Sequence, residues 1–297
     1  MSLPDWRWGY LCENRTLGAT TLRTLRLGNL TAERARDKVQ ANLADLERMV
    51  RFNAEHCIGV LRVGQQLVPF GSHPAFPYDW AEEHGAAMRQ IGVLAAGLSI
   101  CLTMHPGQFV QPGSTDPGVV ERSLAELRYS ARVLSLLNPG DGVMVLHGPA
   151  PGGDREAAAE RFIAALAGET EVLRYLALEN DERWWSVREL LPVAERLGVP
   201  VVADTLHHGW NDGGWTLREA LEAASPTWGG RRQKVHLSSQ AEGGRPGAHA
   251  ELVDPADLEQ LLAAGSHLRL DVMVEAKAKE LAVLPLVGET ARRAGVR

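Results

Sequence analysis

Residue types that bind metal ions recur along this chain, each time at the end of a short apolar run. In one case, the run Leu98–Thr103 is typical of a buried strand and leads into His105 and a Pro-Gly turn. A single histidine at such a position is usually structural, but six successive runs that end in this way indicate a shared site. The residues are His105, His147, Glu179, Asp204, His207, His236 and Glu275, with His249 in the loop after the seventh run.

These donors combine imidazole and carboxylate groups without a thiolate. Such a set suits Zn²⁺, Mn²⁺ or Fe²⁺ better than Mg²⁺ or Ca²⁺. There are too many donors for one ion, which predicts a cluster of two or three ions. Divalent ions about 3.5–4 Å apart activate water and stabilise the leaving oxygen in phosphodiester hydrolysis. The residues thus favour phosphoryl transfer, with Glu179 or Glu275 as the bridging carboxylate.

The spacing of two residue pairs supports a common centre. Asp204 and His207 are three residues apart, so both can turn over the end of a strand. Lys234 and His236 are two residues apart in a predicted strand and therefore share a face. The lysine could be neutral, paired with a substrate phosphate, or carboxylated and thus a metal ligand. The structural alternative is a salt bridge from Lys234 to Glu275 or Asp204.

Eight apolar runs alternate with amphipathic segments, which is the pattern of a (β/α)₈ TIM barrel. We expect one catalytic domain over residues 1–297, with its active site at the carboxyl ends of the strands. A doubly wound open sheet is the alternative. The predicted strands are Trp8–Leu11, Ile58–Val63, Leu98–Thr103, Gly142–Leu146, Tyr175–Leu178, Pro200–Ala203, Lys234–Leu237 and Leu270–Val274. The predicted helices are 31–53 (capped by Thr31), 80–97, 120–134, 156–167, 187–197, 217–224, 255–263 and 277–294.

The composition is that of an ordinary globular protein, with 297 residues of which 45% are hydrophobic and 23% charged. No apolar run approaches the ~20 residues of a membrane span, and residues 1–10 lack a signal-peptide pattern. Cys12, Cys57 and Cys101 are odd in number and far apart. They favour reduced thiols in a cytoplasmic protein and argue against a cysteine zinc site.

The formal net charge of −6 weighs against a general nucleic-acid binder. Bound divalent cations would offset several acidic residues, and basic residues cluster at Arg23 and Arg26 and again at Arg231–Lys234. These clusters are equally typical of a solvated surface. Charge alone does not decide the partner.

Seven motifs resemble the UV damage endonuclease family and occur in the family's order over nearly the whole chain. They are Gly9–Asn14, Met104–Phe109, Leu178–Asp181, Asp204–His208, Lys234–Gln240, Ala248–Ala250 and Met273–Glu280. The family is related to endonuclease IV and, more distantly, to xylose isomerase-like barrels. The resemblance implies an enzyme that begins DNA excision repair by cutting immediately 5′ of cyclobutane dimers, (6-4) photoproducts and some abasic sites. The cut would leave a 3′-hydroxyl and a 5′-phosphate.

The resemblance also implies a three-metal centre, commonly with Mn²⁺. The matching residues are His105, His147 and Glu179 for one ion, Asp204, His236, Glu275 and a shared Glu179 for the second, and His207 and His249 for the third. Lys234 matches a lysine that the family can carry in carboxylated form. His73 matches a histidine near the metals, which we expect to contact phosphate or lesion. The implied catalytic residues are thus Glu179, Lys234 and His73.

Gln108 and Phe109 stand where the family carries a Gln-Tyr pair that inserts into the duplex beside two flipped-out damaged bases. Flipping costs least at distorted pairs, which is one source of lesion selectivity. Phe109 in place of the tyrosine would still insert and stack as a wedge but would lose a hydroxyl contact. The alternative interpretation of Phe109 is an aromatic residue of the core. Tyr10 and Asn14 look like further substrate-binding residues, or else a tyrosine packed on the barrel rim and an asparagine capping a turn.

Three other functions fit parts of the pattern. One is a divalent-metal sugar isomerase or epimerase of the same barrel, which needs no aromatic wedge. Another is an endonuclease IV-like abasic endonuclease. The third is a sensor that binds damaged DNA with purely structural metals. For the leading hypothesis the partner is damaged double-stranded DNA, and a DNA groove across the rim favours a monomer.

Overall fold

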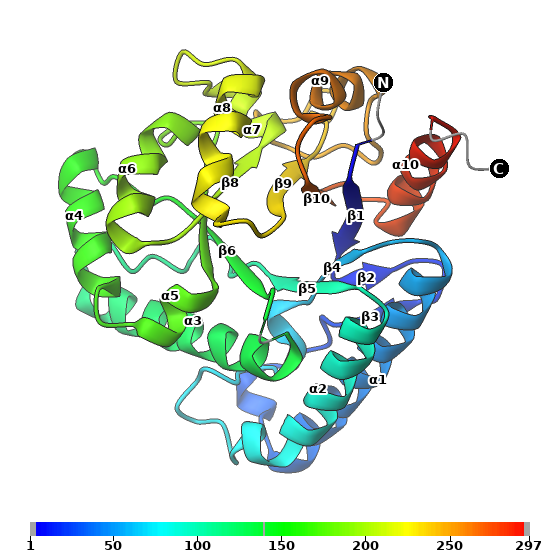
Figure 1. The fold of residues 1–297 in the computed structure, drawn as a ribbon. Helices are drawn as coiled ribbons and strands as arrows, with labels where there is room; N and C mark the ends of the chain where they lie inside the picture. Colours follow the sequence, from blue (N-terminus) through cyan, green and yellow to red (C-terminus); the bar gives the residue numbers. More distant parts are fainter. Residues whose placement is uncertain (1–3, 139, 294–297) are drawn as a thin grey trace.

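The computed structural model describes residues 4–138 and 140–293. Eight parallel strands close into a barrel, in which the last strand returns to pair with the first (Figure 1). The strands in order are β1 (Trp6–Leu11), β4 (Val60–Arg62), β5 (Cys101–Met104), β6 (Val143–His147), β7 (Leu176–Glu179), β8 (Val201–Asp204), β9 (Gln233–Leu237) and β10 (Leu270–Val274). The predicted TIM barrel is confirmed, and the open-sheet alternative is wrong.

Helices surround the barrel (Figure 1). They are α1 (Ala32–Glu55), α2 (Trp80–Gly97), α3 (Pro117–Leu137), α4 (Arg155–Leu166), α5 (Thr170–Tyr175), α6 (Val187–Leu197), α7 (Thr205–Trp210), α8 (Leu217–Ala224), α9 (Pro255–Gly265) and α10 (Glu280–Arg293). Thr31 caps α1 as predicted, because its side chain accepts a hydrogen bond from the Arg34 amide. The predicted last helix extended to Ala294, which lies outside the described residues.

Three features were not predicted. The short helices α5 and α7 lie next to strands β7 and β8, and a two-stranded hairpin of β2 (Glu13–Asn14) and β3 (Ala19–Thr20) follows β1. The predicted strand at Leu98 begins instead at Cys101, because Leu98 is the C-cap of α2 and Ser99 adopts a positive φ of 59°. These differences leave the barrel topology unchanged.

Strand register determines which side chains meet at the carboxyl end of the barrel. Alternate residues of a strand point to the same face. His147 is paired with Glu179 across β6 and β7, and Asp204 with His236 across β8 and β9. Because Glu179 is paired with Val202, two residues before Asp204, all four polar residues point into the barrel interior near its carboxyl end. A buried apolar cluster joins residues of β6, β7 and β8 to a tryptophan from the turn before β9; it contains Val143, Val145, Ala177, Val202 and Trp228.

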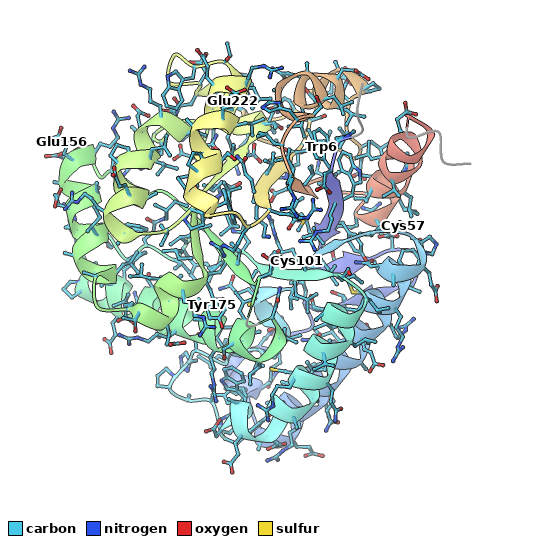
Figure 2. The ribbon with its side chains drawn as sticks, viewed as in Figure 1. Trp6, Cys57, Cys101, Glu156, Tyr175 and Glu222 are labelled. Atoms are coloured by element: carbon cyan, nitrogen blue, oxygen red, sulfur yellow. The ribbon has the colours of Figure 1, made fainter. Side chains whose placement is uncertain are left out.

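The three cysteines are all free, and Cys101 is buried whereas Cys57 is exposed. Figure 2 shows Cys101 close to the middle of the molecule and Cys57 near its edge. Within the described part of the chain, no helix is both long and apolar enough to cross a membrane.

Candidate metal centre

Glu179, the last residue of β7, lies at the centre of a polar cluster at the mouth of the barrel. Its Oε2 is 2.8 Å from His105 Nε2 and 3.6 Å from His147 Nε2, and its Oε1 contacts His236 Nδ1. The residue is 1% exposed. Burial by itself would raise the pKa of Glu179, but the surrounding imidazoles, His236 and His147 above all, hold it well below its ordinary value. The carboxylate is therefore charged at neutral pH.

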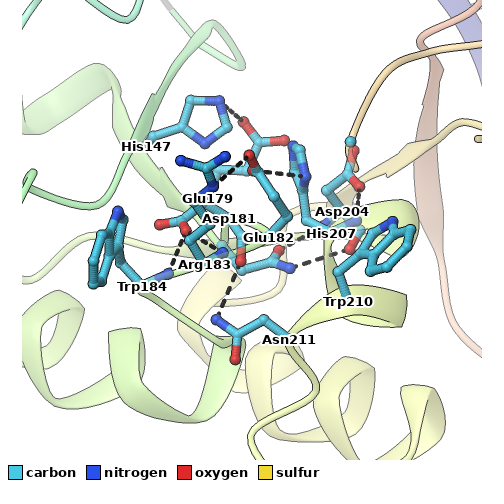
Figure 3. A network of polar contacts seen from close by, with 12 residues as sticks. His147, Glu179, Asp181, Glu182, Arg183, Trp184, Asp204, His207, Trp210 and Asn211 are labelled. Carbon is cyan, nitrogen blue, oxygen red and sulfur yellow. Dashed lines mark hydrogen bonds and ion pairs between the residues drawn. The ribbon is translucent and has the colours of Figure 1, made fainter. Parts of the chain in front are cut away.

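Asp204 and His207 join the cluster through the start of α7 (Figure 3). Asp204 ends β8 and caps this helix, since its Oδ1 accepts a hydrogen bond of 2.7 Å from the His207 amide. His207 Nδ1 lies 3.5 Å from Glu182 Oε2. Burial would lower the pKa of His207, but Asp204 and Glu179 raise it. The cap explains why the predicted three-residue spacing brings both side chains over the mouth.

Glu275 follows β10 and completes the other side of the cluster. Its Oε1 is 3.3 Å from His236 Nδ1, and its Oε2 is 3.7 Å from His249 Nε2. Arg62, the last residue of β4, places Nη2 2.5 Å from Glu275 Oε1. Burial would raise the pKa of Glu275, but Arg62 and His236 lower it to about 2.

The structure brings all eight predicted metal ligands together, and the most compact sets of ligand atoms form two groups. The first group is His105, Glu179, His236 and Glu275, and the second is Glu179, Asp204 and His207, with the atoms of each group within 4.8 Å of one another. Glu179 belongs to both groups, as a bridging ligand should. The expected partition differs, since it joined His105 to His147 and Asp204 to His236. The ring of His147 lies 5.2 Å from that of His105 and 5.6 Å from that of His207.

The hydrogen bonding of His105 fits a divalent cation. Its Nδ1 lies 3.1 Å from the Pro106 carbonyl oxygen, a contact that places the proton on Nδ1. Burial and the nearby Arg62 lower the pKa of His105, so the ring is neutral and its Nε2 lone pair faces Glu179 Oε2. A cation between these two acceptors would satisfy both, and metal-binding histidines usually donate their other N–H in this way.

Unpaired polar atoms at the same site strengthen the fit. Asp204 Oδ2 and His147 Nδ1 are buried and have no hydrogen-bond partner among the residues that the structure describes. Buried polar atoms without a partner are rare in folded proteins. Burial raises the pKa of Asp204; His207 opposes this shift, whereas the neighbouring carboxylates Glu179 and Glu275 add to it. The donors are imidazoles and carboxylates, which suit Mn²⁺, Zn²⁺ or Fe²⁺.

A cavity of about 540 Å³ opens at this cluster. Four basic residues on its wall were not singled out from the sequence: Arg62, Arg245, Lys277 and Lys279. They make the mouth locally favourable for an anionic substrate in a protein of net charge −6. Of the four, Arg62 had a detectable signal, because it interrupts the apolar run Ile58–Val63 with a charge.

Gln108 and Phe109 form the tip of a turn beside the cavity, and both are exposed. The Val110 amide donates to the Gly107 carbonyl oxygen at 2.9 Å, and the Gly107 amide donates to Gln65 Oε1 at 2.9 Å. Phe109 is 70% exposed, so the core-aromatic alternative is wrong. The turn is thus anchored at its base and presents an amide and an aromatic ring to solvent.

His73 lies beside this turn and outside the two ligand groups. Together with Phe109 it lines a second cavity of about 670 Å³ between the loop after β4 and helix α3. Its Nδ1 accepts a hydrogen bond of 3.1 Å from the Ala75 amide. This position agrees better with a contact to the substrate than with a role in holding the ions.

Tyr10 and Asn14 line neither cavity. Tyr10 is fully buried; its hydroxyl donates to Asn53 Oδ1 at 2.8 Å and accepts from Asn14 Nδ2 at 2.9 Å. Asn14 Oδ1 accepts a hydrogen bond of 2.8 Å from the Leu17 amide. These contacts favour the alternative, a packed tyrosine and an asparagine that caps a turn, and the substrate-binding role stays a prediction.

Lys234 precedes His236 by two residues on β9 and therefore lies deeper in the barrel. Its Nζ is 2.7 Å from Asp271 Oδ2 and 3.5 Å from Asp141 Oδ1. Arg7 pairs with the same Asp271 at 2.7 Å. Burial would lower the pKa of Lys234, but these carboxylates help to raise it. The lysine is thus paired with Asp271, not with Glu275 or Asp204, and its carboxylation stays a prediction.

A family model described as UV-endonuclease UvdE matches residues 6–297. The UV-damage endonuclease of Neurospora crassa is 35% identical over 269 residues, which cover 83% of this chain and 40% of that protein. The chain therefore spans less than half of the fungal relative. A putative UV-damage endonuclease of Acanthamoeba polyphaga mimivirus is 32% identical over 298 residues, covering 94% of this chain and 90% of the viral protein.

Two solved structures place the fold among known barrels. The crystal structure of SacUVDE has a TM-score of 0.92 and 30% identity, and the match covers 98% of this chain and all of that chain. Endonuclease IV from Thermus thermophilus has a TM-score of 0.62 and 17% identity, with 97% of this chain and 99% of that chain covered. The second likeness concerns the fold alone.

Proposed function

Because the chain belongs to the UV-endonuclease UvdE family, we propose that it is a metal-dependent UV DNA damage endonuclease. Its reaction is hydrolysis of the phosphodiester immediately 5′ of cyclobutane dimers and (6-4) photoproducts, and of some abasic sites, leaving a 3′-hydroxyl and a 5′-phosphate. The observation that carries this proposal is the Glu179-centred cluster, which opens into a basic cavity beside an exposed Gln-Phe turn.

The proposed cofactors are two or three divalent ions, with Mn²⁺ the first choice among those that the donor set accommodates. Their ligands would be His105, His147, Glu179, Asp204, His207, His236, His249 and Glu275. When bound, such ions activate a water molecule and stabilise the leaving oxygen. The chain's own part is to hold these donors rigidly, since each is anchored at a strand end or, for His207 and His249, in the segment that follows.

The proposed partner is damaged double-stranded DNA. Phe109 would stack in the duplex beside Gln108 where two bases have left the helix, and base–aromatic stacking contributes about 1–3 kcal/mol per base. His73, on the cavity next to Phe109, would contact the lesion or its phosphate. Lys277, Lys279 and other basic residues of the mouth would attract the DNA backbone. We propose that the enzyme acts as a monomer in the cytoplasm.

A nicking assay tests the proposal. The substrates are one duplex with a single thymine dimer, one with an abasic site and one undamaged, each with Mn²⁺ and with chelator. A metal-dependent cut directly 5′ of the dimer is the expected result. Cutting of the abasic duplex alone would favour an endonuclease IV-like activity. No cutting of any duplex would contradict an endonuclease and make a sugar isomerase the next activity to assay.

A further inference from the structure

Arg62 is a buried cation in contact with two of the proposed metal ligands. Its Nη2 lies 2.9 Å from His236 Nε2 and 2.5 Å from Glu275 Oε1. The residue is 7% exposed, and it lies on the wall of the cavity above the cluster. Its Nε is buried and has no hydrogen-bond partner among the described residues. A guanidinium donor left unpaired at a cavity wall is suited to an anion.

The guanidinium and an ion make opposite demands on the same two residues. A guanidinium only donates hydrogen bonds, so His236 Nε2 must offer its lone pair to Arg62 while Nδ1 carries the proton toward Glu179. Nδ1 is the ring nitrogen that faces Glu179 and Glu275, so an ion held with these carboxylates would take the Nδ1 lone pair and leave the proton on Nε2, against the Arg62 donor. Glu275 Oε1 faces both His236 Nδ1 and Arg62. A divalent ion and the guanidinium therefore exclude each other at His236 and compete for Glu275 Oε1, and two cations so close repel each other.

The cavity has room for the Arg62 side chain once an ion has displaced it. Its wall includes Gln108, Lys277 and Lys279 as well as Arg62, so it is the space in which a DNA phosphate would meet the ligand cluster. The planar fork of arginine matches two phosphate oxygens, and arginine is weakly hydrated and always charged. An anion in this cavity would be within reach of a side chain that starts from the end of β4.

We propose that Arg62 exchanges partners during function: it holds His236 and Glu275 until metal binds, and then binds a phosphate oxygen at the cleaved bond. The inference rests on the proposed function. In the metal-loaded complex Arg62 contacts substrate and stabilises the charge that develops on the phosphate. Before loading, it neutralises carboxylates that would otherwise repel one another.

The two roles predict opposite effects of one substitution. In Arg62→Gln the competing cation is absent, so Mn²⁺ measured calorimetrically without DNA should bind about 10-fold more tightly. Mn²⁺ should also raise the melting temperature of this variant more than that of the wild type. Single-turnover nicking at saturating Mn²⁺ should fall about 100-fold, the loss typical of one stabilising donor. Arg51→Gln, which breaks an exposed pair with Glu47 on α1, is the matched control and should change none of these.

Unchanged Mn²⁺ affinity in Arg62→Gln would overturn the competition, and wild-type nicking would overturn the phosphate contact; either result rejects the exchange. If this variant does not fold, Arg62→Lys keeps the charge without the fork and should still lose at least about 10-fold in nicking. Wild-type rates in Arg62→Lys would then reject the proposal. A wild-type protein that binds Mn²⁺ but cuts no DNA would instead show that the proposed function fails.

Discussion

His105 Nε2 lies 2.8 Å from Glu179 Oε2, while the opposite ring nitrogen of this histidine faces the Pro106 carbonyl oxygen. The turn after β5 thus sets the ring orientation and the tautomer, and the lone pair is directed at the most central carboxylate. Loss of such an outer contact of a metal ligand typically costs about 10–100-fold in metal affinity or activity. The centre is therefore organised by backbone geometry as well as by the donors.

Glu179→Gln should abolish nicking and reduce bound Mn²⁺ while the fold persists. The amide keeps the size of the side chain but removes the charge that belongs to both ligand groups. We expect a loss of more than about 100-fold in nicking, with metal content measured by elemental analysis and folding by circular dichroism. Glu160→Gln, on the surface and paired with Arg196, is the control. Full activity in the Glu179 variant would remove this residue from the centre.

Replacing both Gln108 and Phe109 by alanine should weaken lesion discrimination and leave metal content unchanged, because neither belongs to a ligand group. Loss of one stacking contact predicts about a 10-fold fall in the ratio of cutting on dimer-containing and undamaged duplexes. Phe109→Tyr keeps the ring and should preserve that ratio. An unaltered ratio in the double variant would show that this exposed turn is not the probe.

The convergence of the candidate ligands could be predicted from the sequence because barrel strands end at one rim, so residue types at successive strand ends must meet there; that they bind metal stays a prediction. The same logic does not reach Tyr10, whose side chain faces away from the barrel interior. Arg7 points inward to Asp271, so Tyr10, three residues on, points outward to Asn53 on α1. A motif match does not tell to which face of the strand a side chain points. For Tyr10 this face follows only from the position of Arg7 and the register of β1.

Two charged residues show a second limit of prediction from sequence, which concerns their partners across the barrel. The spacing of Lys234 placed it correctly on the face of His236, but its partner Asp271 comes from the adjacent β10, which only the β9–β10 register identifies. Arg62 ends an apolar strand, and its contacts with His236 and Glu275 join positions more than 170 residues apart in the chain. Local patterns predict the element and often the face, whereas partners across a barrel require the closed sheet.

Asp45→Asn should destabilise the protein at neutral pH and much less in acid. Asp45 accepts hydrogen bonds from Arg48 and the Thr20 amide and pairs with Arg23 at 2.6 Å, which ties α1 to the β2–β3 hairpin. Burial would raise its pKa, but Arg23 and the other donors lower it below 3.8. A lowered pKa contributes stability above the unfolded value, and this contribution disappears as pH falls through the folded one.

We therefore expect Asp45→Asn to cost about 1–3 kcal/mol at pH 7, with the difference from wild type shrinking below about pH 4. Urea unfolding at several pH values measures it. A difference that stays constant down to pH 3 would mean that the Asp45 charge adds nothing to folding.

Lys234→Met separates a structural from a metal-binding lysine. In the structure this side chain neutralises Asp271, whose carboxylate is fully buried and otherwise pairs with Arg7. Removing one partner of a buried ion pair costs about 3–5 kcal/mol where the other charge is left uncompensated. Because Arg7 still pairs with Asp271, urea unfolding should show a loss no larger than this, while the number of bound Mn²⁺ ions is unchanged. Lys38→Met, on the outer helix α1, should stay within about 0.5 kcal/mol of wild type. If Lys234 is instead carboxylated and acts as a ligand, the variant will bind fewer Mn²⁺ ions per chain than the wild type.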